Sequence, residues 1–380
     1  MAVAHVIDDE QELIAAIHEL AVERVAPRAA EIDHTGQFPW DMQELLAQQD
    51  ILAMPFPTEY GGLGSTELAV VMAIEELSRY CATTGLLLAV HQLGAMPILL
   101  AGNEEQKGKY ITRLASGEWM AAFGLTEAGS GSDAAGMKTI GVRKGDKYII
   151  NGAKRFITNG GLAQVNSVFV NTNPARGTRG VSAFIIEKDF PGFSVGRIEE
   201  KMGIKGSQTA ELIFTDCEVP VENMLGREGE GFKIAMATLD RTRIGIGAQA
   251  VGIAQGALDL AVSYAKERVQ FGKPIAENQG IQFMLADMAT KVEASRLLVY
   301  NAAEMVDRED KNFGKYSAMA KMFASDSAIA VTNDAIQVLG GYGYMKEYPA
   351  ERMMRDAKIT QIYEGTNQIQ RLVIARELLK

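Results

Sequence analysis

Glu364, near the end of the chain, has the surroundings best suited to acid–base chemistry. Gly365 follows it and would let the backbone turn sharply, and Thr366 or Asn367 could cap the helix that the pattern predicts over 368–379. The N-terminus of such a helix presents free N–H groups to anionic or polar ligand groups. The stretch is also typical of an ordinary capped loop with a solvated glutamate, and these residues alone favour that interpretation without excluding the other.

Four further segments have residue types that could contact a ligand. The run 123–133 combines glycines with hydroxyl side chains and could form an anion-binding nest, although it lacks the spacing of a dinucleotide fingerprint or a P-loop. A strand-like run places Phe156 and Thr158 on one face, where they could lie against a planar ring. Segments 268–272 and 337–341 offer a cation and amides beside glycines. Each segment alone is also compatible with a plain loop, strand or helix terminus.

Composition excludes several classes of function. The chain has 380 residues, 47% of them hydrophobic, and 38 Lys plus Arg against 48 Asp plus Glu give a net charge of −10. This balance argues against non-specific binding to nucleic acid or membranes. Two cysteines, and four histidines without H-E-x-x-H spacing, give no indication of a metal site. Residues 6–10 are acidic where a targeting peptide would be basic, and no uninterrupted apolar run approaches a membrane span, so we expect a soluble cytoplasmic protein.

The elements that must position these residues follow from hydrophobic periodicity. Helical spacing predominates at first, short β-branched runs with Gly-containing turns follow, including a turn expected at Asn151–Gly152, and helix-long apolar stripes then return. We predict an α+β, mainly α fold. Its parts are an N-terminal helical domain (1–119), a middle β-barrel or sandwich domain (120–230) and a C-terminal helical bundle (231–380).

One predicted helix, 86–101, is apolar on nearly all sides and should therefore be buried. It carries His91. This histidine is either a core residue with a satisfied hydrogen bond or a polar group that faces a substrate cavity.

Six segments in this order and spacing together resemble the acyl-CoA dehydrogenase family. They are LTEAGSGSD (125–133), FITN (156–159), RVQFG (268–272), QVLGGYG (337–343), RDAK (355–358) and IYEGT (362–366). The resemblance covers nearly the whole chain. It implies an FAD-dependent homotetramer with an N-terminal helical domain, a middle β-domain and a C-terminal four-helix bundle, the same division that periodicity predicts independently.

The resemblance also assigns cofactor contacts. Those to the isoalloxazine ring are Phe123, Leu125, Thr126, Gly131, Ser132, Phe156 and Thr158. The family's usual Trp in the strand motif is Phe156 here, which keeps a stacking surface but lacks the indole donor. Contacts to the adenine dinucleotide, several of them reaching across from a neighbouring subunit, are Arg268, Gln270, Phe271, Asn278, Gln279, Gln337, Gly340 and Gly341, and Thr366 and Gln368 complete the site.

The implied reaction is α,β-dehydrogenation of an acyl-CoA thioester to the 2-enoyl-CoA. Substrate contacts correspond to Ser132, Asp240, Arg243 and Gly365. The resemblance makes Glu364 the base for the α-proton, places the carbonyl oxygen between a flavin ribityl hydroxyl and the Glu364 N–H, and sends the β-hydride to flavin N5. Burial against an apolar substrate would raise the pKa of the base toward neutrality, which suits a weak carbon acid. Some members of the family carry the base at another position, on the helix that includes Thr242 here. Because the aligned residue in this chain is a threonine and not a carboxylate, the resemblance favours Glu364 as the base.

The biological setting is less constrained. The resemblance implies fatty acid β-oxidation, with an electron-transfer flavoprotein as electron acceptor, in the cytoplasm or, for a processed eukaryotic form, in the mitochondrial matrix. An acyl-CoA oxidase that uses oxygen, a dehydrogenase for a cyclic or branched acyl-CoA, and a non-catalytic flavin-binding subunit are the alternatives. We expect a short to medium acyl chain. A dicarboxylyl substrate would require a cation at the cavity floor, and residues 83–88 supply none.

Overall fold

The computed structural model describes residues 8–380, and residues 1–7, which include His5 and the start of the acidic run, lie outside it. The first helical part comprises α1 (Asp8–Leu20), α2 (Ala29–Thr35), α3 (Trp40–Gln48), α4 (Glu67–Tyr80), α5 (Ala82–Ala101) and α6 (Glu104–Ala115). The strands that follow are β1 (Ala121–Gly124), β2 (Ile140–Lys144), β3 (Lys147–Thr158), β4 (Val165–Asn171), β5 (Val181–Glu187), β6 (Phe193–Ile198), β7 (Thr209–Pro220) and β8 (Met224–Leu225). The last part comprises α7 (Gly231–Glu267), β9 (Val269–Gln270), β10 (Lys273–Pro274), α8 (Gln279–Asp307), α9 (Phe313–Leu339), α10 (Ala350–Thr360) and α11 (Asn367–Leu378). The predicted mainly helical fold with a central β region is confirmed.

The middle strands form one 8-stranded sheet in the order β6-β7-β3-β2-β4-β5-β8, with β1 paired in parallel to β4. The turn predicted at Asn151–Gly152 is wrong, because β3 continues through it. Asn151 pairs with Ile140 of β2 and Gly152 pairs with Phe214 of β7, while the extra residue of the β-bulge at this point lies on β7. The chain reverses instead between β2 and β3, where Gly145 has a positive φ of 68°.

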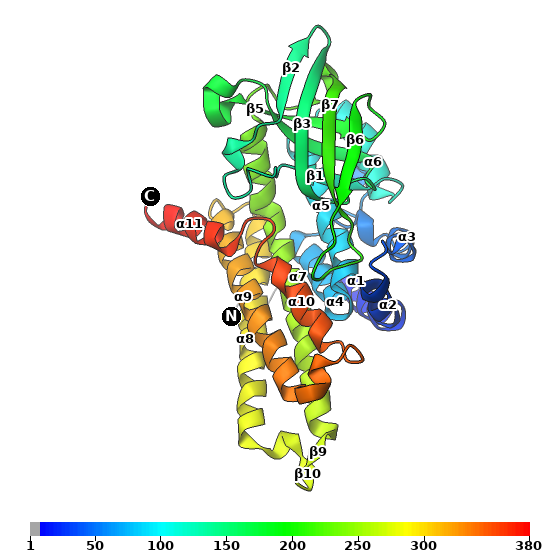
Figure 1. Cartoon of the computed structure of the whole chain (residues 1–380), viewed down its shortest axis with the longest axis vertical. Coiled ribbons are helices and arrows are strands. Elements are labelled where there is room, and N and C mark those ends of the chain that lie inside the picture. Colours follow the sequence, from blue (N-terminus) through cyan, green and yellow to red (C-terminus); the bar gives the residue numbers. More distant parts are fainter. Residues whose placement is uncertain (1–7) are drawn as a thin grey trace.

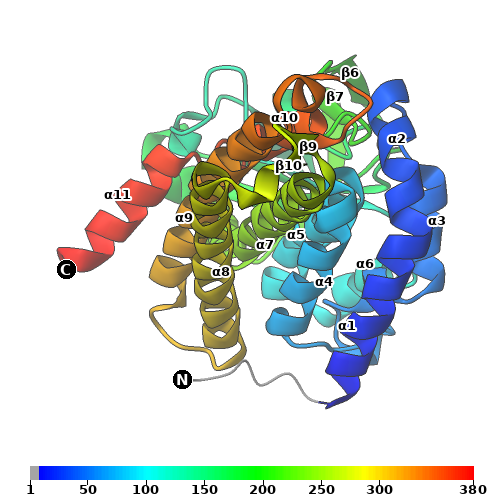
Figure 2. The same ribbon diagram turned by 90° about the horizontal axis from the view of Figure 1, so that it is seen from below.

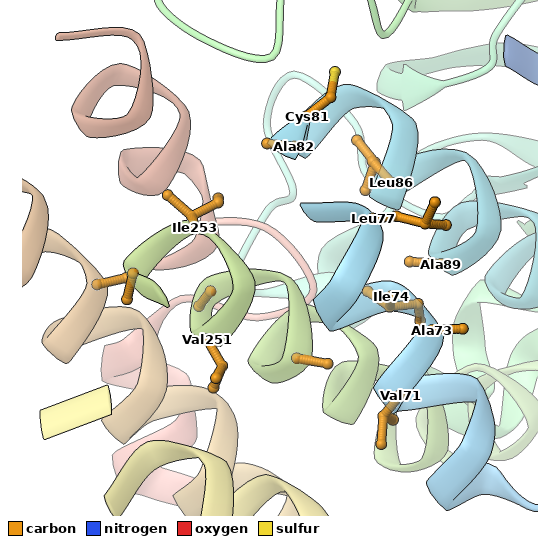
Figure 3. Close-up of a cluster of buried hydrophobic side chains, with 14 of the residues drawn as sticks. Val71, Ala73, Ile74, Leu77, Cys81, Ala82, Leu86, Ala89, Val251 and Ile253 are labelled. Carbon is orange, nitrogen blue, oxygen red and sulfur yellow. The ribbon is translucent and has the colours of Figure 1, made fainter. Parts of the chain in front are cut away.

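Helix α7 is the central element of the helical parts. It packs against α4 and α5 on one side and against α8 and α9 on the other, while α1 to α3 lie outermost (Figure 2). The approach to α4 is close, since a Cβ at Gly252 would lie only 2.2 Å from the Glu75 carbonyl oxygen. Buried apolar side chains of α4, α5 and α7, such as Ile74, Ala89 and Val251, belong to one hydrophobic cluster around these helices (Figure 3). The bundle and the N-terminal helices therefore share one core.

Two of these helices, α5 and α7, contain windows long and apolar enough to cross a membrane by composition alone. Their windows are 83% and 78% buried inside the protein, respectively. This burial accounts for their apolar composition, and it agrees with the buried helix predicted over 86–101.

The overall layout places the sheet at one end of the molecule. The β9–β10 hairpin lies at the opposite end of the long axis, and α7 runs between the two ends (Figure 1). Helices α10 and α11 pack against α9, and the loop that joins them carries Glu364.

Candidate active site

The loop between α10 and α11 contains two successive residues in the left-handed backbone region. The φ angle is 50° at Glu364 and 91° at Gly365. A Cβ at position 365 would lie 2.6 Å from Nε2 of Gln370, so the turn favours glycine on both conformational and steric grounds. Thr366 caps α11, because its side chain accepts a hydrogen bond from the Ile369 N–H. The sharp turn and the capped helix predicted from the sequence are both present.

The carboxyl group of Glu364 is held from α7. Thr242 Oγ1 donates a hydrogen bond of 3.0 Å to Glu364 Oε2. Burial raises the pKa of Glu364 to about 7, while the Thr242 hydrogen bond and the charges of Arg243 and Lys321 act in the opposite direction. A carboxylate with a pKa near the working pH is well matched to accepting a proton from a weak acid.

A second set of side chains holds the backbone of this loop. Buried Arg243 donates from Nη1 to Gln370 Oε1 at 3.1 Å. Gln370 Nε2 donates in turn to the carbonyl oxygens of Glu364 at 3.2 Å and Gly365 at 2.9 Å. Lys321 Nζ, from α9, donates to the Gly365 carbonyl at 2.7 Å. Sequence reasoning missed Gln370 and Lys321, although a lysine within the small, apolar residues of α9 was an available signal.

The residues predicted to contact an isoalloxazine ring lie along β1, β3 and the loop between β1 and β2. The pairing of β3 with β7 shifts in register between Lys154 and Ile157. Within this irregular stretch, Phe156 has a φ of 60° and is 59% exposed. The Arg155 N–H donates to the Thr126 carbonyl at 2.8 Å, so the loop runs beside β3. Phe123, Leu125, Thr126, Phe156 and Thr158 therefore come from adjacent segments, whereas Gly131 and Ser132 lie farther along the loop and are exposed.

Most residues predicted to contact the adenine dinucleotide lie elsewhere. Arg268, Gln270, Gly340 and Gly341 line a cavity of about 530 Å³ beside the β9–β10 hairpin, and Phe271 at the hairpin tip is fully exposed. The remaining members are at helix ends: Asn278 and Gln279 at the start of α8, and exposed Gln337 near the end of α9.

The first group belongs to the sheet and its loops, and the second surrounds the β9–β10 hairpin, which lies at the end of the long axis remote from the sheet, so one chain does not bring them together (Figure 1). Thr366 and Gln368, which were predicted to complete the site, line a separate cavity of about 380 Å³ at the start of α11.

Two of the polar side chains considered in the sequence analysis, Arg243 and His91, are buried inside the protein. Arg243, predicted to contact substrate, is 4% exposed and is engaged by Gln370 and by Asp240, whose Oδ1 lies 3.0 Å from Arg243 Nη2. His91 is buried, and its Nε2 lies 2.8 Å from the Leu114 carbonyl oxygen, to which it donates. Its ring also makes an edge contact with Phe56. The structure therefore supports the core interpretation of His91.

Comparison with known proteins gives consistent matches along the chain. The models described as the N-terminal, middle and C-terminal domains of acyl-CoA dehydrogenase match residues 7–118, 122–217 and 229–379. An acyl-CoA dehydrogenase of Bacillus subtilis is 52% identical over 376 residues, with 99% of both chains covered. Butyryl-CoA dehydrogenase from Megasphaera elsdenii superposes with a TM-score of 0.96 at 47% identity, with both chains fully covered. A chain solved in work on the electron transferring flavoprotein of Acidaminococcus fermentans has a TM-score of 0.97 at 52% identity over the full length of both.

Proposed function

The chain belongs to the acyl-CoA dehydrogenase family of oxidoreductases, and we propose that it removes the α-proton of a short- to medium-chain acyl-CoA with Glu364 as the general base. The observation that carries this proposal is the state of Glu364. Its carboxyl group is oriented by Thr242, its backbone is fixed in a left-handed turn, and burial raises its pKa to about 7. A solvated glutamate in an ordinary loop would have none of these features.

The residues of this chain would divide the work as follows. Glu364 accepts the α-proton on its carboxylate, and Thr242 keeps one oxygen fixed so that the other is free to react. Among the residues that the structure describes, the Glu364 backbone N–H has no hydrogen-bond acceptor, so it is available for the thioester carbonyl oxygen. A donor at that oxygen would stabilise the negative charge that develops as the α-proton leaves.

The family is FAD-dependent, and FAD, when bound, supplies the acceptor for the β-hydride. The residues present fit such a group. Phe156 offers an exposed ring next to the loop 125–133, and the open cavity at Gly340 and Gly341 lets a polar chain approach the backbone. The separation of these two groups fits a site completed by a second copy of the chain, in support of the proposed homotetramer.

The physiological setting follows from the same proposal. Likeness to a butyryl-CoA dehydrogenase supports a short acyl group, and likeness to the chain from the flavoprotein work supports an electron-transfer flavoprotein as acceptor. We also propose the three-domain division at 119/120 and 230/231 and a cytoplasmic location, as inferred from the sequence.

The test is a substrate panel on the purified, FAD-loaded protein. Butyryl-, hexanoyl-, octanoyl-, isobutyryl- and cyclohexanecarbonyl-CoA are mixed anaerobically with the enzyme, and bleaching of the flavin absorbance is followed. We expect fast bleaching with butyryl- or hexanoyl-CoA, and turnover with a dye acceptor but little oxygen uptake. Absence of bleaching with every thioester would contradict the function, and rapid oxygen uptake would indicate an oxidase.

A further inference from the structure

Lys321 is a buried lysine directly behind the loop that carries Glu364. It lies in the middle of α9 and its side chain has no solvent exposure. Taking an ammonium group out of water is strongly unfavourable unless hydrogen bonds and nearby charge compensate for the lost hydration. A methionine would fill a similar volume without that penalty, so a lysine at this position requires a specific reason.

The contacts of its Nζ supply a geometric reason. Nζ donates to the Gly365 carbonyl at 2.7 Å and to Asn367 Oδ1 at 3.0 Å. Gln370 binds the same Gly365 carbonyl at 2.9 Å, so Lys321 on α9 and Gln370 on α11 hold one peptide group together. That peptide group joins Gly365 to Thr366, one residue beyond Glu364, so holding it fixes the turn from which the Glu364 side chain projects.

The charges around this loop supply an electrostatic reason. Burial lowers the pKa of Lys321 to about 7, and the nearby negative charge of Glu364 acts to raise it. Burial raises the pKa of Glu364, and the positive charges of Arg243 and Lys321 lower it. The two groups therefore stabilise each other's charged forms in a volume that excludes most water.

Other ionisable groups face this cluster from each neighbouring element. Helix α7 contributes Arg243 and Asp240, which form an ion pair of 3.0 Å. Asp326 on α9 acts to raise the pKa of Lys321, and Arg376 on α11 acts to lower that of Arg243. Among the described residues, Lys321 has no ion pair within contact distance, so its charge is not cancelled by a directly bonded carboxylate.

We propose that Lys321 is a positioning residue for the dehydrogenation, which fixes the Gly365 carbonyl and holds Glu364 in its ionised form by its positive charge. This inference rests on the proposed function. Lys321 acts through Glu364 and therefore need not touch the substrate. Its signature is an upward shift in the pH dependence of proton removal, because a less ordered loop would admit water and lower the pKa of Glu364, whereas loss of the lysine charge raises it.

The test compares Lys321→Met, Lys321→Gln and Lys321→Arg with wild type, after FAD content and sedimentation show that each variant is assembled. The rate of anaerobic flavin bleaching by butyryl-CoA is measured against pH. In the wild type the rate is lost as the pH falls through the pKa of Glu364, because the protonated carboxyl group cannot accept the α-proton. Removal of the charge should move this midpoint upward by about one pH unit in both the Met and the Gln variant, while the Arg variant keeps the wild-type midpoint.

Ser325→Ala is the matched control. It removes the 2.9 Å hydrogen bond between Asn367 Nδ2 and Ser325 Oγ, which also ties the loop to α9, without changing any charge. Its rate can fall, but its midpoint should stay at the wild-type pH. If the Met variant does not assemble, the Gln variant provides the test.

Two outcomes would overturn the role of Lys321: an unchanged midpoint in an active Met or Gln variant, or full recovery of the wild-type profile by Gln, which keeps a donor but no charge. Failure of the proposed function is a different result. It would appear as absence of flavin bleaching in the wild-type protein itself.

Discussion

His91 is one of the few polar side chains on α5, and its hydrogen bond to Leu114 joins α5 to α6. We expect His91→Leu to lower the free energy of unfolding by about 1 kcal/mol, because the leucine cannot donate to that carbonyl. The loss is limited since the Gly117 N–H also donates to the Leu114 carbonyl. The ranking of acyl-CoA substrates by kcat/KM should not change.

Thermal unfolding and the substrate panel measure these two effects. His18→Leu is a suitable comparison, because His18 contacts Glu76 at a half-exposed site and its loss should change stability by less than about 0.5 kcal/mol. A His91→Leu enzyme with altered acyl preference and unchanged stability would show that this histidine faces the substrate.

At this scale, the sequence predicted the turn and the helix cap around Glu364, the proposed base, but not the residues that hold them. The Glu-Gly-Thr order indicates a turn and a helix cap, and Glu364 and Thr366 occupy those positions. Lys321 is 43 positions away from Glu364 (364 − 321), and local patterns carry no information about which buried groups meet in space. A charged residue on an apolar helical stripe was the available signal.

Among the elements, the loop after β1 depends on one buried ion pair. Lys154 on β3 is fully buried and donates from Nζ to Glu127 Oε1 at 2.7 Å and to the Leu125 carbonyl at 3.1 Å. Lys154→Met should lower the free energy of unfolding by about 3 kcal/mol, because it leaves the largely buried Glu127 carboxylate without its cation. The same change should weaken FAD retention, since the loop carries predicted isoalloxazine contacts.

Thermal unfolding of the FAD-free protein and FAD release on dilution are the measurements. Lys147→Met on the same strand is the matched control: Lys147 pairs with Glu218 at 2.7 Å, but both side chains are exposed, so its loss should change stability by less than about 1 kcal/mol. Equal effects of the two substitutions would contradict the anchoring role of Lys154.

Element types could be predicted more reliably than their local details. Long apolar stripes identified the main helices, because apolar residues at three- and four-residue spacing form one continuous face that packs against neighbouring elements over many turns. Asn151–Gly152 was predicted as a turn because this dipeptide is typical of hairpin turns, but pairing with β2 and β7 keeps both residues within β3. The positive φ at Phe156 was not foreseeable from residue type, since an aromatic residue rarely adopts it.

For the whole molecule, the separation of the two groups of predicted FAD contacts has a measurable consequence. Phe271 lies on the β9–β10 hairpin, which is remote from the sheet that carries Phe156, so we expect tight FAD binding only in an assembled oligomer (Figure 1). Phe271→Ser should weaken FAD retention by roughly tenfold or more, because a fully exposed aromatic ring contributes to binding only when a partner surface or ligand covers it. Sedimentation combined with FAD content tests this, and a monomer that keeps FAD as tightly as the assembly would contradict it.

The most direct measurement of the central claim is the anaerobic rate of flavin reduction in Glu364→Gln. The amide keeps the size of the side chain and can still accept the Thr242 hydrogen bond, but it cannot take up the α-proton. FAD content and acyl-CoA affinity should therefore remain near wild type, while the reduction rate in stopped flow falls by about 10²–10⁴-fold. A variant that retains more than about a tenth of the wild-type rate would contradict the assignment of Glu364 as the base.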